Sequence, residues 1–405
     1  MILPAPRPSS PPIPPPPVAD APWSTTRVVA VEGLEALRDE WDELLAASPA
    51  DGLFLSWEWL SCWWRHLGAG RELALVAVRR GDRLAAVAPL ARGSGRWRFA
   101  PPAVGLLGTG TVGSDYLDVV ARAGEELRAT ERIADQLERR PEIVELAQLE
   151  RGRTSAALLT RTLERRGWRS LARPTGICPW IDLAGRSWEE YVADLGASHR
   201  ANLRRRTRKL ERRYRVEFQE VTNARELPAA LAELVRLHRL RWRPRGGSDG
   251  LEAPELIAFH QDFARAALDR GWLRLYLLRL DGEPAAALYG FRYGGRFLFY
   301  QSGFDPRFAD DAVGMICMAR SIRAAIEEGA QEYDLLHGDE PYKFLWADRR
   351  RQLERIELFP PTAAARLEHG RRRLVRAAKD CLRPWRDRAL GAGRRAAVPA
   401  RSTDR

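Results

Sequence analysis

The residues with the clearest chemical potential lie between 296 and 346, where a strand, a loop, a helix and a second strand are predicted in succession. Phe297–Ser302 alternates as a strand does, and Met315–Glu328 repeats apolar residues at helical spacing. A loop entering a helix directs free N–H groups and the positive helix end at one point, which favours phosphate or pyrophosphate. Gly314 would let such a ligand approach the backbone. An ordinary strand-to-helix turn with a packing glycine gives the same pattern, so both interpretations stay open.

A cluster of titratable side chains follows the second predicted strand, Tyr333–Leu336; its members are His337, Asp339, Glu340, Tyr342 and Lys343. Of the 66 basic residues, only three are lysines. A lysine kept in such a composition suggests that a compact ammonium is needed rather than a planar guanidinium, although chance would also leave a few.

The chain as a whole has the composition of a folded protein. Its 405 residues suffice for two ordinary domains with cores, and 45% hydrophobic residues with 14 Trp exclude a chain that is disordered throughout. No run approaches the roughly 20 apolar residues that span a bilayer, and the N-terminus does not resemble a signal peptide. The four scattered cysteines form neither a zinc motif nor a disulfide framework. We therefore expect a cytoplasmic protein that uses no metal.

The two ends of the chain differ from the rest. Ten of the first 22 residues are Pro, so a mobile, polyproline-like tail is predicted at 1–25. Residues 361–405 hold 13 Arg or Lys against four acids, which accounts for most of the net charge of +12. This tail suits an anionic surface such as nucleic acid or phospholipid headgroups, while a solvated, Arg-rich helix would have the same composition.

An internal repeat divides the central part. Residues 73–100 align without gaps on residues 273–300 with nine identities, and each copy reads as a hairpin followed by a third strand. Two tandem domains on one plan follow from this repeat. The helix that comes after the first copy opens with Glu125 and Glu126, which would repel a pyrophosphate. The first domain is therefore predicted to be a degenerate copy.

Several other segments support the predicted second domain. Ser187 is a predicted helix N-cap, and Ser198–Arg215 carries nine Arg or Lys and one acid. This basic helix would contact a polyanion such as a nucleotide phosphate or RNA, or would simply be a solvated face. The loop Pro244–Gly250 between two predicted helices is flexible enough to act as a lid. In the first domain, Ser56 is a predicted N-cap of an aromatic helix that belongs to the core.

The hairpin, the strand ending in YQSGFD, the helix opening near Gly314 and the segment YDLLHGDEPYKFLW together resemble the GNAT acyltransferase superfamily. The likeness is greatest to its CelD-like (BioF2-like) acetyltransferase branch, whose relatives include Fem-type proteins with two tandem GNAT domains. It covers about residues 30–360. It implies an α/β (α+β) fold with two tandem GNAT-like domains, each a mixed, mostly antiparallel sheet flanked by helices. The expected domains are a degenerate one at 26–185 and an acyltransferase at 186–360, followed by a basic tail at 361–405.

The resemblance implies acetyl-CoA or another acyl-CoA as co-substrate, lying between two splayed strands. Its pyrophosphate would lie on the N–H groups around Val313, Gly314 and Met315, and the strand Tyr300–Gly303 would face the thioester. Two further residues are assigned to the donor, Ser302 and Arg204. The sequence departs from the usual GNAT pattern because Asp311 stands where Gln or Arg is common, and only one glycine follows. Asp311 is expected to be the helix N-cap.

Acyl transfer to an amine needs a base, a stabiliser for the oxyanion and a proton donor for the thiolate. Under this resemblance His337 or Asp339 is the general base, Lys343 stabilises negative charge, and Tyr342 or Tyr300 protonates the thiolate. The acceptor implied is a small amine, such as an amino sugar or a cell-envelope or exopolysaccharide precursor. Two other functions stay open: a Fem-type transferase that uses aminoacyl-tRNA, and a non-catalytic protein that binds nucleic acid or a membrane surface on a GNAT scaffold.

Overall fold

The computed structural model describes residues 21–93, 102–152, 154–243, 246–247 and 249–396. The predicted Pro-rich tail therefore lies largely outside the described residues, although its last residues already belong to a strand that begins at Trp23. Three residues of the predicted lid loop, Pro244, Arg245 and Ser248, also lie outside them.

The first half of the chain alternates short strands with four-turn helices or shorter ones. Its elements are β1 (Trp23–Val28), α1 (Val31–Ala36), α2 (Arg38–Ala46), η1 (Leu53–Leu55), α3 (Trp57–Leu67), β2 (Glu72–Leu73), β3 (Leu75–Arg80), β4 (Arg83–Ala88), β5 (Leu90–Arg92), β6 (Ala103–Leu106), β7 (Val120–Ala121), α4 (Glu126–Glu138), β8 (Ile143–Glu150), α5 (Ser155–Arg165) and β9 (Arg169–Asp182).

The second half contains the longer hairpin and the long C-terminal helix. Its elements are α6 (Trp188–Asp194), α7 (Ala197–Arg213), β10 (Val216–Glu220), α8 (Leu227–Trp242), η3 (Asp249–Leu251), α9 (Pro254–Asp269), β11 (Leu273–Leu280), β12 (Glu283–Tyr293), β13 (Arg296–Phe304), η4 (Pro306–Asp311), α10 (Val313–Glu327), β14 (Glu332–Asp334), η5 (Lys343–Leu345), β15 (Arg349–Phe359) and α11 (Ala363–Ala396).

Several helix ends follow from local sequence. The Ser56 hydroxyl caps α3 by accepting from the backbone N–H of Trp59, and Ser187 forms a capping box at α6, so both predicted N-caps are confirmed. Gly329, with φ of 72°, ends α10 in the left-handed conformation that glycine adopts without strain. No helix in the described part of the chain combines the length and apolar character needed to cross a membrane.

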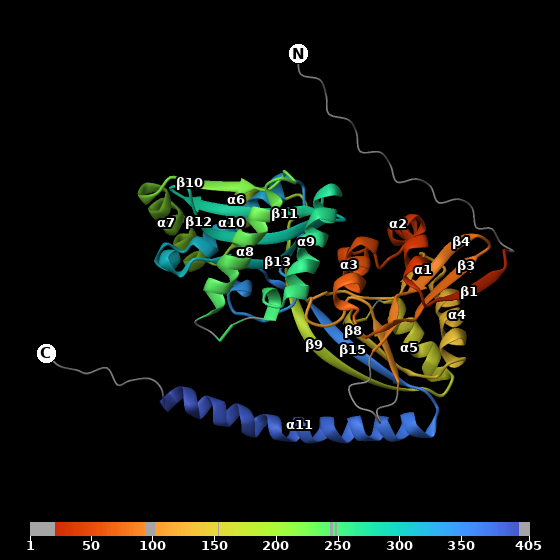
Figure 1. Cartoon of the computed structure of the whole chain (residues 1–405). Helices are drawn as coiled ribbons and strands as arrows, with labels where there is room; N and C mark the ends of the chain where they lie inside the picture. The colour runs from red at the N-terminus through yellow and green to blue at the C-terminus, as the bar shows by residue number, and fades with distance from the viewer. Residues whose placement is uncertain (1–20, 94–101, 153, 244–245, 248, 397–405) are drawn as a thin grey trace, which may run out of the picture.

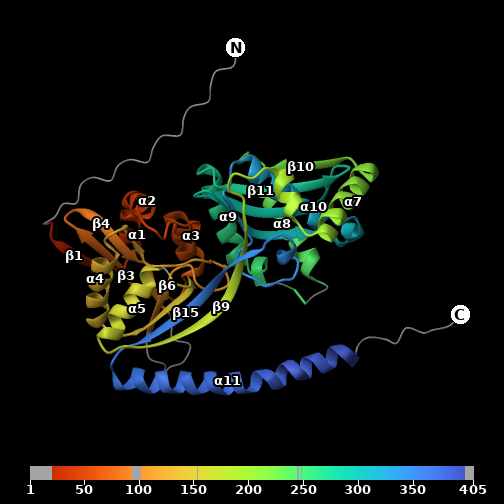
Figure 2. The same cartoon turned by 180° about the vertical axis from the view of Figure 1, so that it is seen from behind.

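One sheet runs through both halves. It has eleven strands in the order β10-β11-β12-β13-β14-β9-β15-β8-β6-β5-β2, and a second sheet has the order β1-β3-β4-β7. Figures 1 and 2 show the two halves side by side, with β9 and β15 running between them. The mixed, mostly antiparallel sheets flanked by helices confirm the predicted fold class.

The last strand does not stay with its neighbours in sequence. β15 pairs antiparallel with β9 on one side and with β8 on the other, so it completes the sheet of the first half. In turn, β9 of the first half pairs with β14 of the second half. The sheet therefore has no break at the predicted boundary near residue 186. Both strands are long, with 14 residues in β9 and 11 in β15.

The two copies of the internal repeat share a hairpin with the same irregularity. The pairing of β3 with β4 shifts register between Val78 and Arg79, and the pairing of β11 with β12 shifts between Leu278 and Arg279. After the hairpin the copies diverge. Pro89 separates β4 from β5 in the first copy, since proline has no N–H for the ladder, whereas β12 runs on to Tyr293.

The main core joins α3 of the first half to α8 and α9 of the second half. Trp59 lies at its centre and packs edge-on against the rings of Phe54, Phe259 and Phe263 at 4.6–4.9 Å. The aromatic stripe of α3 is thus core, as its spacing predicted. A second core lies between α10 and the β11–β13 strands.

Candidate functional site

A cleft opens where β13 and β14 separate. These parallel strands pair only at Arg296–Leu298 and Glu332–Asp334. Beyond Asp334 the chain follows β9 instead, since the N–H of Leu335 donates to the carbonyl of Pro179 at 2.9 Å and that of Gly338 donates to Ile177 at 3.0 Å. β13 continues without this neighbour to Phe304. The two strands therefore diverge, and we call the pocket lined by this part of β13 the β13 cleft.

The β13 cleft has a volume of about 310 Å³ and walls from six elements, α7, α8, β12, β13, α10 and η5. Most of its lining is apolar: Ala287, Leu288, Phe299, Phe304, Met315, Met318, Leu345 and Trp346. The polar side chains that line it are His199, Arg241, Ser302 and Tyr342. A narrow apolar cleft with a few fixed polar groups suits a flexible thioester chain with a reactive end.

The helix α10 begins at the cleft. No side chain caps its N-terminus, and the preceding residue, Ala312, has φ of 57°. The first N–H groups of a helix have no partner within it, so those of Val313, Gly314 and Met315 are available to an anion. A Cβ on Gly314 would lie 3.4 Å from the Phe304 ring in the cleft wall. A large side chain at this position would therefore enter the cleft.

Asp311 is not the N-cap of α10, so this expectation is wrong. Its buried carboxylate accepts from Lys209 Nζ at 3.1 Å, Arg213 Nη1 at 3.3 Å and Tyr214 Oη at 3.2 Å. Burial opposes ionisation, but these cationic partners outweigh it and lower the pKa of Asp311. The acid that replaces the usual Gln or Arg is thus neutralised by α7 and adds little repulsion toward an anion.

The basic helix α7 lies against the loop that leads into α10. Besides the contacts with Asp311, Arg206 Nη1 donates to the carbonyl of Asp310 at 2.5 Å. Arg204, which the sequence assigned to the donor, does not line the β13 cleft. It lies with Arg208 in a separate groove of about 640 Å³ between α7 and the later turns of α10.

The structure places three of the predicted catalytic residues outside the cleft lining. Lys343 is buried, and its ammonium donates to the carbonyls of Leu336 at 3.2 Å and His337 at 2.7 Å. The same ammonium pairs with Glu340 at 3.1 Å. His337 and Asp339 are exposed on the loop that Lys343 holds. The His337 ring covers Gly176 of β9, where a Cβ would collide with it.

The two predicted tyrosines point in different directions. The Tyr300 hydroxyl donates to the carbonyl of Val112 in the first half, and its ring packs against Trp59 at 5.8 Å. Tyr300 therefore belongs to the contact between the halves and does not line the cleft. Tyr342 does line it, below the guanidinium of Arg241, and burial raises the pKa of Tyr342.

Of the predicted donor residues, the cleft brings together Ser302, Gly303, Gly314 and Met315, while Val313 is buried beneath it. Gly303 also has a packing role. A Cβ there would collide with the backbone of His238, so α8 approaches β13 this closely only because residue 303 is glycine.

Sequence reasoning missed two polar residues of the cleft, His199 and Arg241. His199 is buried, packs edge-on against the Trp346 ring at 4.5 Å, and its Nε2 has no hydrogen-bond partner among the described residues. Burial lowers the pKa of His199, so the imidazole is neutral. One signal was present, since His199 shares the buried face of α7 with Leu203 and Leu210.

Arg241 presents a fixed positive charge to the cleft. Its Nη1 donates to Ser302 Oγ at 2.7 Å, and the guanidinium lies over the rings of Phe304 at 5.6 Å and Tyr342 at 5.8 Å. In a sequence with so many arginines, nothing in the spacing of residues distinguishes Arg241 from its exposed neighbours. The cleft thus combines a neutral base, a fixed cation and a protonated phenol.

Comparison with known proteins agrees with this geometry. Residues 197–344 match the family model described as an acetyltransferase (GNAT) domain. This stretch of the second half is therefore similar to a GNAT acetyltransferase domain, in agreement with its motifs. No curated protein matches the sequence.

Two solved structures are similar in fold. FemX has a TM-score of 0.57 at 11% identity, with 82% of this chain and 96% of that chain covered. A conserved protein of unknown function from Bacteroides thetaiotaomicron VPI-5482 has a TM-score of 0.53 at 13% identity, with 79% and 96% covered. At these identities the likeness concerns the fold alone, and it extends over both halves of the chain.

Proposed function

We propose that this protein is an N-acyltransferase that moves an acetyl or longer acyl group from acyl-CoA to an amine. The observation that carries the proposal is the β13 cleft, which opens directly at the uncapped N-terminus of α10 within the residues that match the GNAT family model. An acyl-CoA needs an apolar channel for its thioester arm and a polyanion site at one end, and this arrangement supplies both.

The roles in the reaction are assigned to residues that line the cleft. The unpartnered Nε2 of His199 accepts the proton that the amine loses as its nitrogen attacks the thioester carbon. Arg241 stabilises the negative charge of the tetrahedral oxygen. When the C–S bond breaks, Tyr342 gives a proton to the thiolate, since its raised pKa keeps the phenol protonated until then. These assignments replace those of His337, Asp339 and Lys343.

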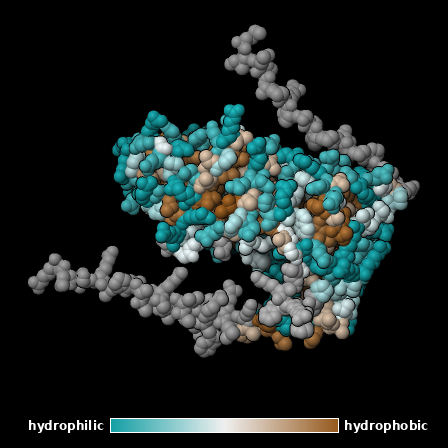
Figure 3. Space-filling model, in the orientation of Figure 1, coloured by the Kyte–Doolittle hydropathy of each residue, from teal (hydrophilic) through white to brown (hydrophobic). Residues whose placement is uncertain are grey.

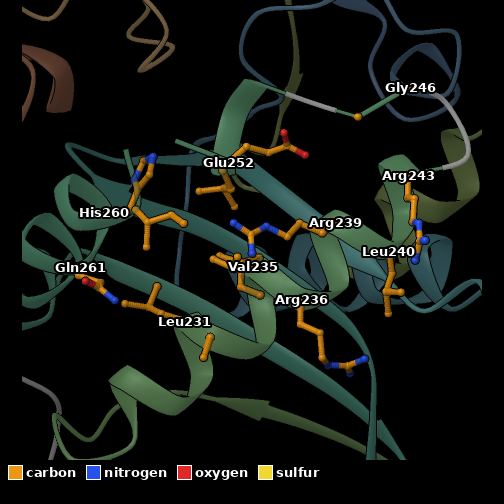
Figure 4. A pocket seen from close by; sticks show the side chains of 15 residues that line it. Leu231, Val235, Arg236, Arg239, Leu240, Arg243, Gly246, Glu252, His260 and Gln261 are labelled. Atoms are coloured by element: carbon orange, nitrogen blue, oxygen red, sulfur yellow. The ribbon is translucent and has the colours of Figure 1, made fainter. Parts of the chain in front are cut away.

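A second groove offers a place for the acceptor. It lies between α8 and α9, has a volume of about 770 Å³, and has an apolar floor that includes Leu231, Leu234 and Leu251. Figure 4 shows Arg239 extending into this groove between Glu252 and Val235. Figure 3 shows hydrophobic surface over α8, on the same side of the molecule.

The charges in this α8–α9 groove indicate the kind of acceptor. Arg239 and Arg243 are exposed and make no ion pair with the described residues. An amine that also carries an anionic group would bind these guanidinium groups, and Glu252 would attract its ammonium. The resemblance to the CelD-like branch implies amino sugars or cell-envelope or exopolysaccharide precursors as acceptors. These classes include compounds that carry both an amine and an anionic group. The reaction would then take place in the cytoplasm, where acyl-CoA is available.

A Fem-type transfer from aminoacyl-tRNA is the second candidate function. The fold similarity to FemX and the basic surface of α7 favour it. In that case the β13 cleft would accept an aminoacyl ester, and acyl-CoA would not bind. A non-catalytic protein on a GNAT scaffold, the remaining alternative, would bind neither acyl-CoA nor aminoacyl-tRNA.

Calorimetric titration with acetyl-CoA and with free CoA tests the proposal. We expect micromolar binding to the natural chain and its loss in Gly314→Glu, because the new carboxylate would enter the cleft beside the helix N-terminus. Gly370→Glu is the matched control, since a Cβ at Gly370 meets nothing within 4 Å. Absence of acyl-CoA binding by the natural chain, with aminoacyl-tRNA bound instead, would replace the proposal by the Fem-type function.

A further inference from the structure

The C-terminal helix α11 leaves most of its surface outside the folded body. Figures 1 and 2 show it passing below the first half and extending toward the second. Among the side chains that the structure describes, those of its N-terminal turns contact the body. Ala365 is buried against Ile143 and Phe359, and Arg372 Nη1 pairs with Glu145 at 2.7 Å and with Glu357 at 3.0 Å. This attachment fixes which face of α11 points away from the protein.

The outward face of α11 carries exposed apolar side chains on both sides of Arg371, whose guanidinium pairs with Glu368 at 2.6 Å. Leu367 is 77% exposed, Leu374 is 73% exposed and Val375 is 42% exposed. Leu367 and Leu374 are seven residues apart and lie on one side of the helix, and the exposed Ala378 and Cys381 continue the same side at helical spacing. Figure 3 shows this hydrophobic surface at the lower edge of the molecule, over the N-terminal part of α11. Leucines exposed to this extent on a regular helix need an apolar partner.

The flanks of the same face are strongly basic. Residues 363–396 contain ten Arg and one Lys against three acidic residues. Arg366 and Arg373 are exposed and make no ion pair with the described residues. Arg372 and Arg376 face the body, where Glu145 and Glu357 neutralise them. Arg366 and Arg373 each precede a leucine of the outward face by one residue, so the unneutralised charge borders the leucines along one edge of that face.

A row of exposed leucines bordered by unpaired arginines matches an anionic lipid surface. The headgroups attract the guanidinium groups, and the acyl boundary accepts the leucines. Nucleic acid would satisfy the arginines, but it would leave the leucines in water. A second copy of the chain would cover the leucines and would bring two basic helices together against their charge. We propose that the outward face of α11 binds the surface of an anionic phospholipid membrane and holds the enzyme there as a peripheral protein.

The test is co-sedimentation of the full chain with vesicles. We expect binding to phosphatidylglycerol–phosphatidylcholine vesicles, weaker binding at high salt, and little binding to phosphatidylcholine alone. The double variant Leu367→Asp and Leu374→Asp should lower the affinity at least about tenfold, because it removes the apolar contact and adds repulsion. The matched control is Leu127→Asp, since Leu127 is 51% exposed on the distant helix α4.

A second variant separates charge from apolar contact. Arg366→Glu and Arg373→Glu together should lower vesicle binding by a similar factor at low salt and by less at high salt. Acyl-CoA binding should be unchanged in both variants, because α11 does not line the β13 cleft. Equal vesicle binding by the natural chain and the leucine variant would overturn the proposal. So would DNA binding that exceeds vesicle binding, or a dimer that the leucine variant dissociates while neither form binds vesicles.

Discussion

The Tyr116 hydroxyl of the first half donates a 2.7 Å hydrogen bond to Asp334 Oδ2 of the second half, at the point where β13 and β14 separate. Asp334 is fully buried. Its Oδ1 accepts from the backbone N–H of Leu336 at 2.8 Å, and Arg351 of β15 also donates to Oδ2, at 3.2 Å. Asp334 thus connects the start of the cleft to β15 and to the first half. The first half supports the cleft without lining it.

Removal of this contact should weaken the fold. Tyr116→Phe leaves a buried carboxylate oxygen with one partner fewer, and we expect the free energy of unfolding to fall by about 1–3 kcal/mol. Urea unfolding measures the difference. Tyr293→Phe is the control, because the Tyr293 hydroxyl also binds a carboxylate, that of Asp51 at 2.7 Å, but at an exposed site. Equal losses in both variants would contradict a special role of Tyr116.

Asp115 should make the stability depend on pH. Burial raises the pKa of Asp115 to about 6, against the hydrogen bond from the His337 N–H and the charge of Lys343. The native state therefore binds a proton more tightly than the unfolded chain. This contribution is present below about pH 4 and is lost as the pH rises through about 6.

The pH effect can be measured by urea unfolding at pH 4.5 and at pH 7. Between these values the natural chain should lose about 2 kcal/mol more than Asp115→Asn, which has no proton to release. If both proteins show the same change between the two pH values, Asp115 has an ordinary pKa in the native state.

Lys343→Ala should act on stability before it acts on chemistry. The substitution leaves the carbonyls of Leu336 and His337 without the ammonium that binds them, so we expect a loss of about 2–4 kcal/mol. Lys209→Ala serves as a comparison, because the half-exposed Lys209 shares Asp311 with Arg213 and Tyr214. A tenfold or larger fall in turnover with unchanged unfolding would restore Lys343 to the catalytic residues.

His199→Gln should lower the rate of acyl transfer at least about tenfold and leave the affinity for acetyl-CoA within about twofold of the natural chain. Glutamine fills a similar space but accepts no proton. Release of the CoA thiol, followed over a range of pH, measures the rate. The natural enzyme should lose activity as the pH falls below the lowered pKa of His199, and the variant should lack this limb. His66→Gln is the control, because His66 does not line the cleft and its ring contacts Asp262 at 2.7 Å.

Much of the architecture was predictable from local pattern. The repeat at 73–100 and 273–300 predicted two similar hairpins, and the structure gives them the same register shift. The caps at Ser56 and Ser187 and the helix end at Gly329 depend on single residues and their neighbours, so they were predictable too. The motifs around Gly314 indicated a GNAT domain, which the family match at 197–344 confirms.

The placement of side chains around the cleft was not predictable, because it depends on strands from distant parts of the chain. Proximity in sequence grouped His337, Asp339 and Lys343 with the site, but β9 draws their loop away from β13. Tyr300 lies in a strand, as the alternation of residues predicted. The Trp59 ring of the first half, however, packs against the sheet face on which the Tyr300 side chain lies.

The sequence by itself determined the elements, the repeat and the segment that matches a GNAT domain, because capping, periodicity and turn chemistry act over a few residues. Only the tertiary structure decided which polar groups meet in the cleft. His199 and Arg241 come from two helices that are distant from the motif in sequence. Arg241 reaches the cleft because Gly303 lets α8 pack on β13, and His199 reaches it because α7 lies against the start of α10. Long-range packing of this kind leaves no periodic signal in the sequence.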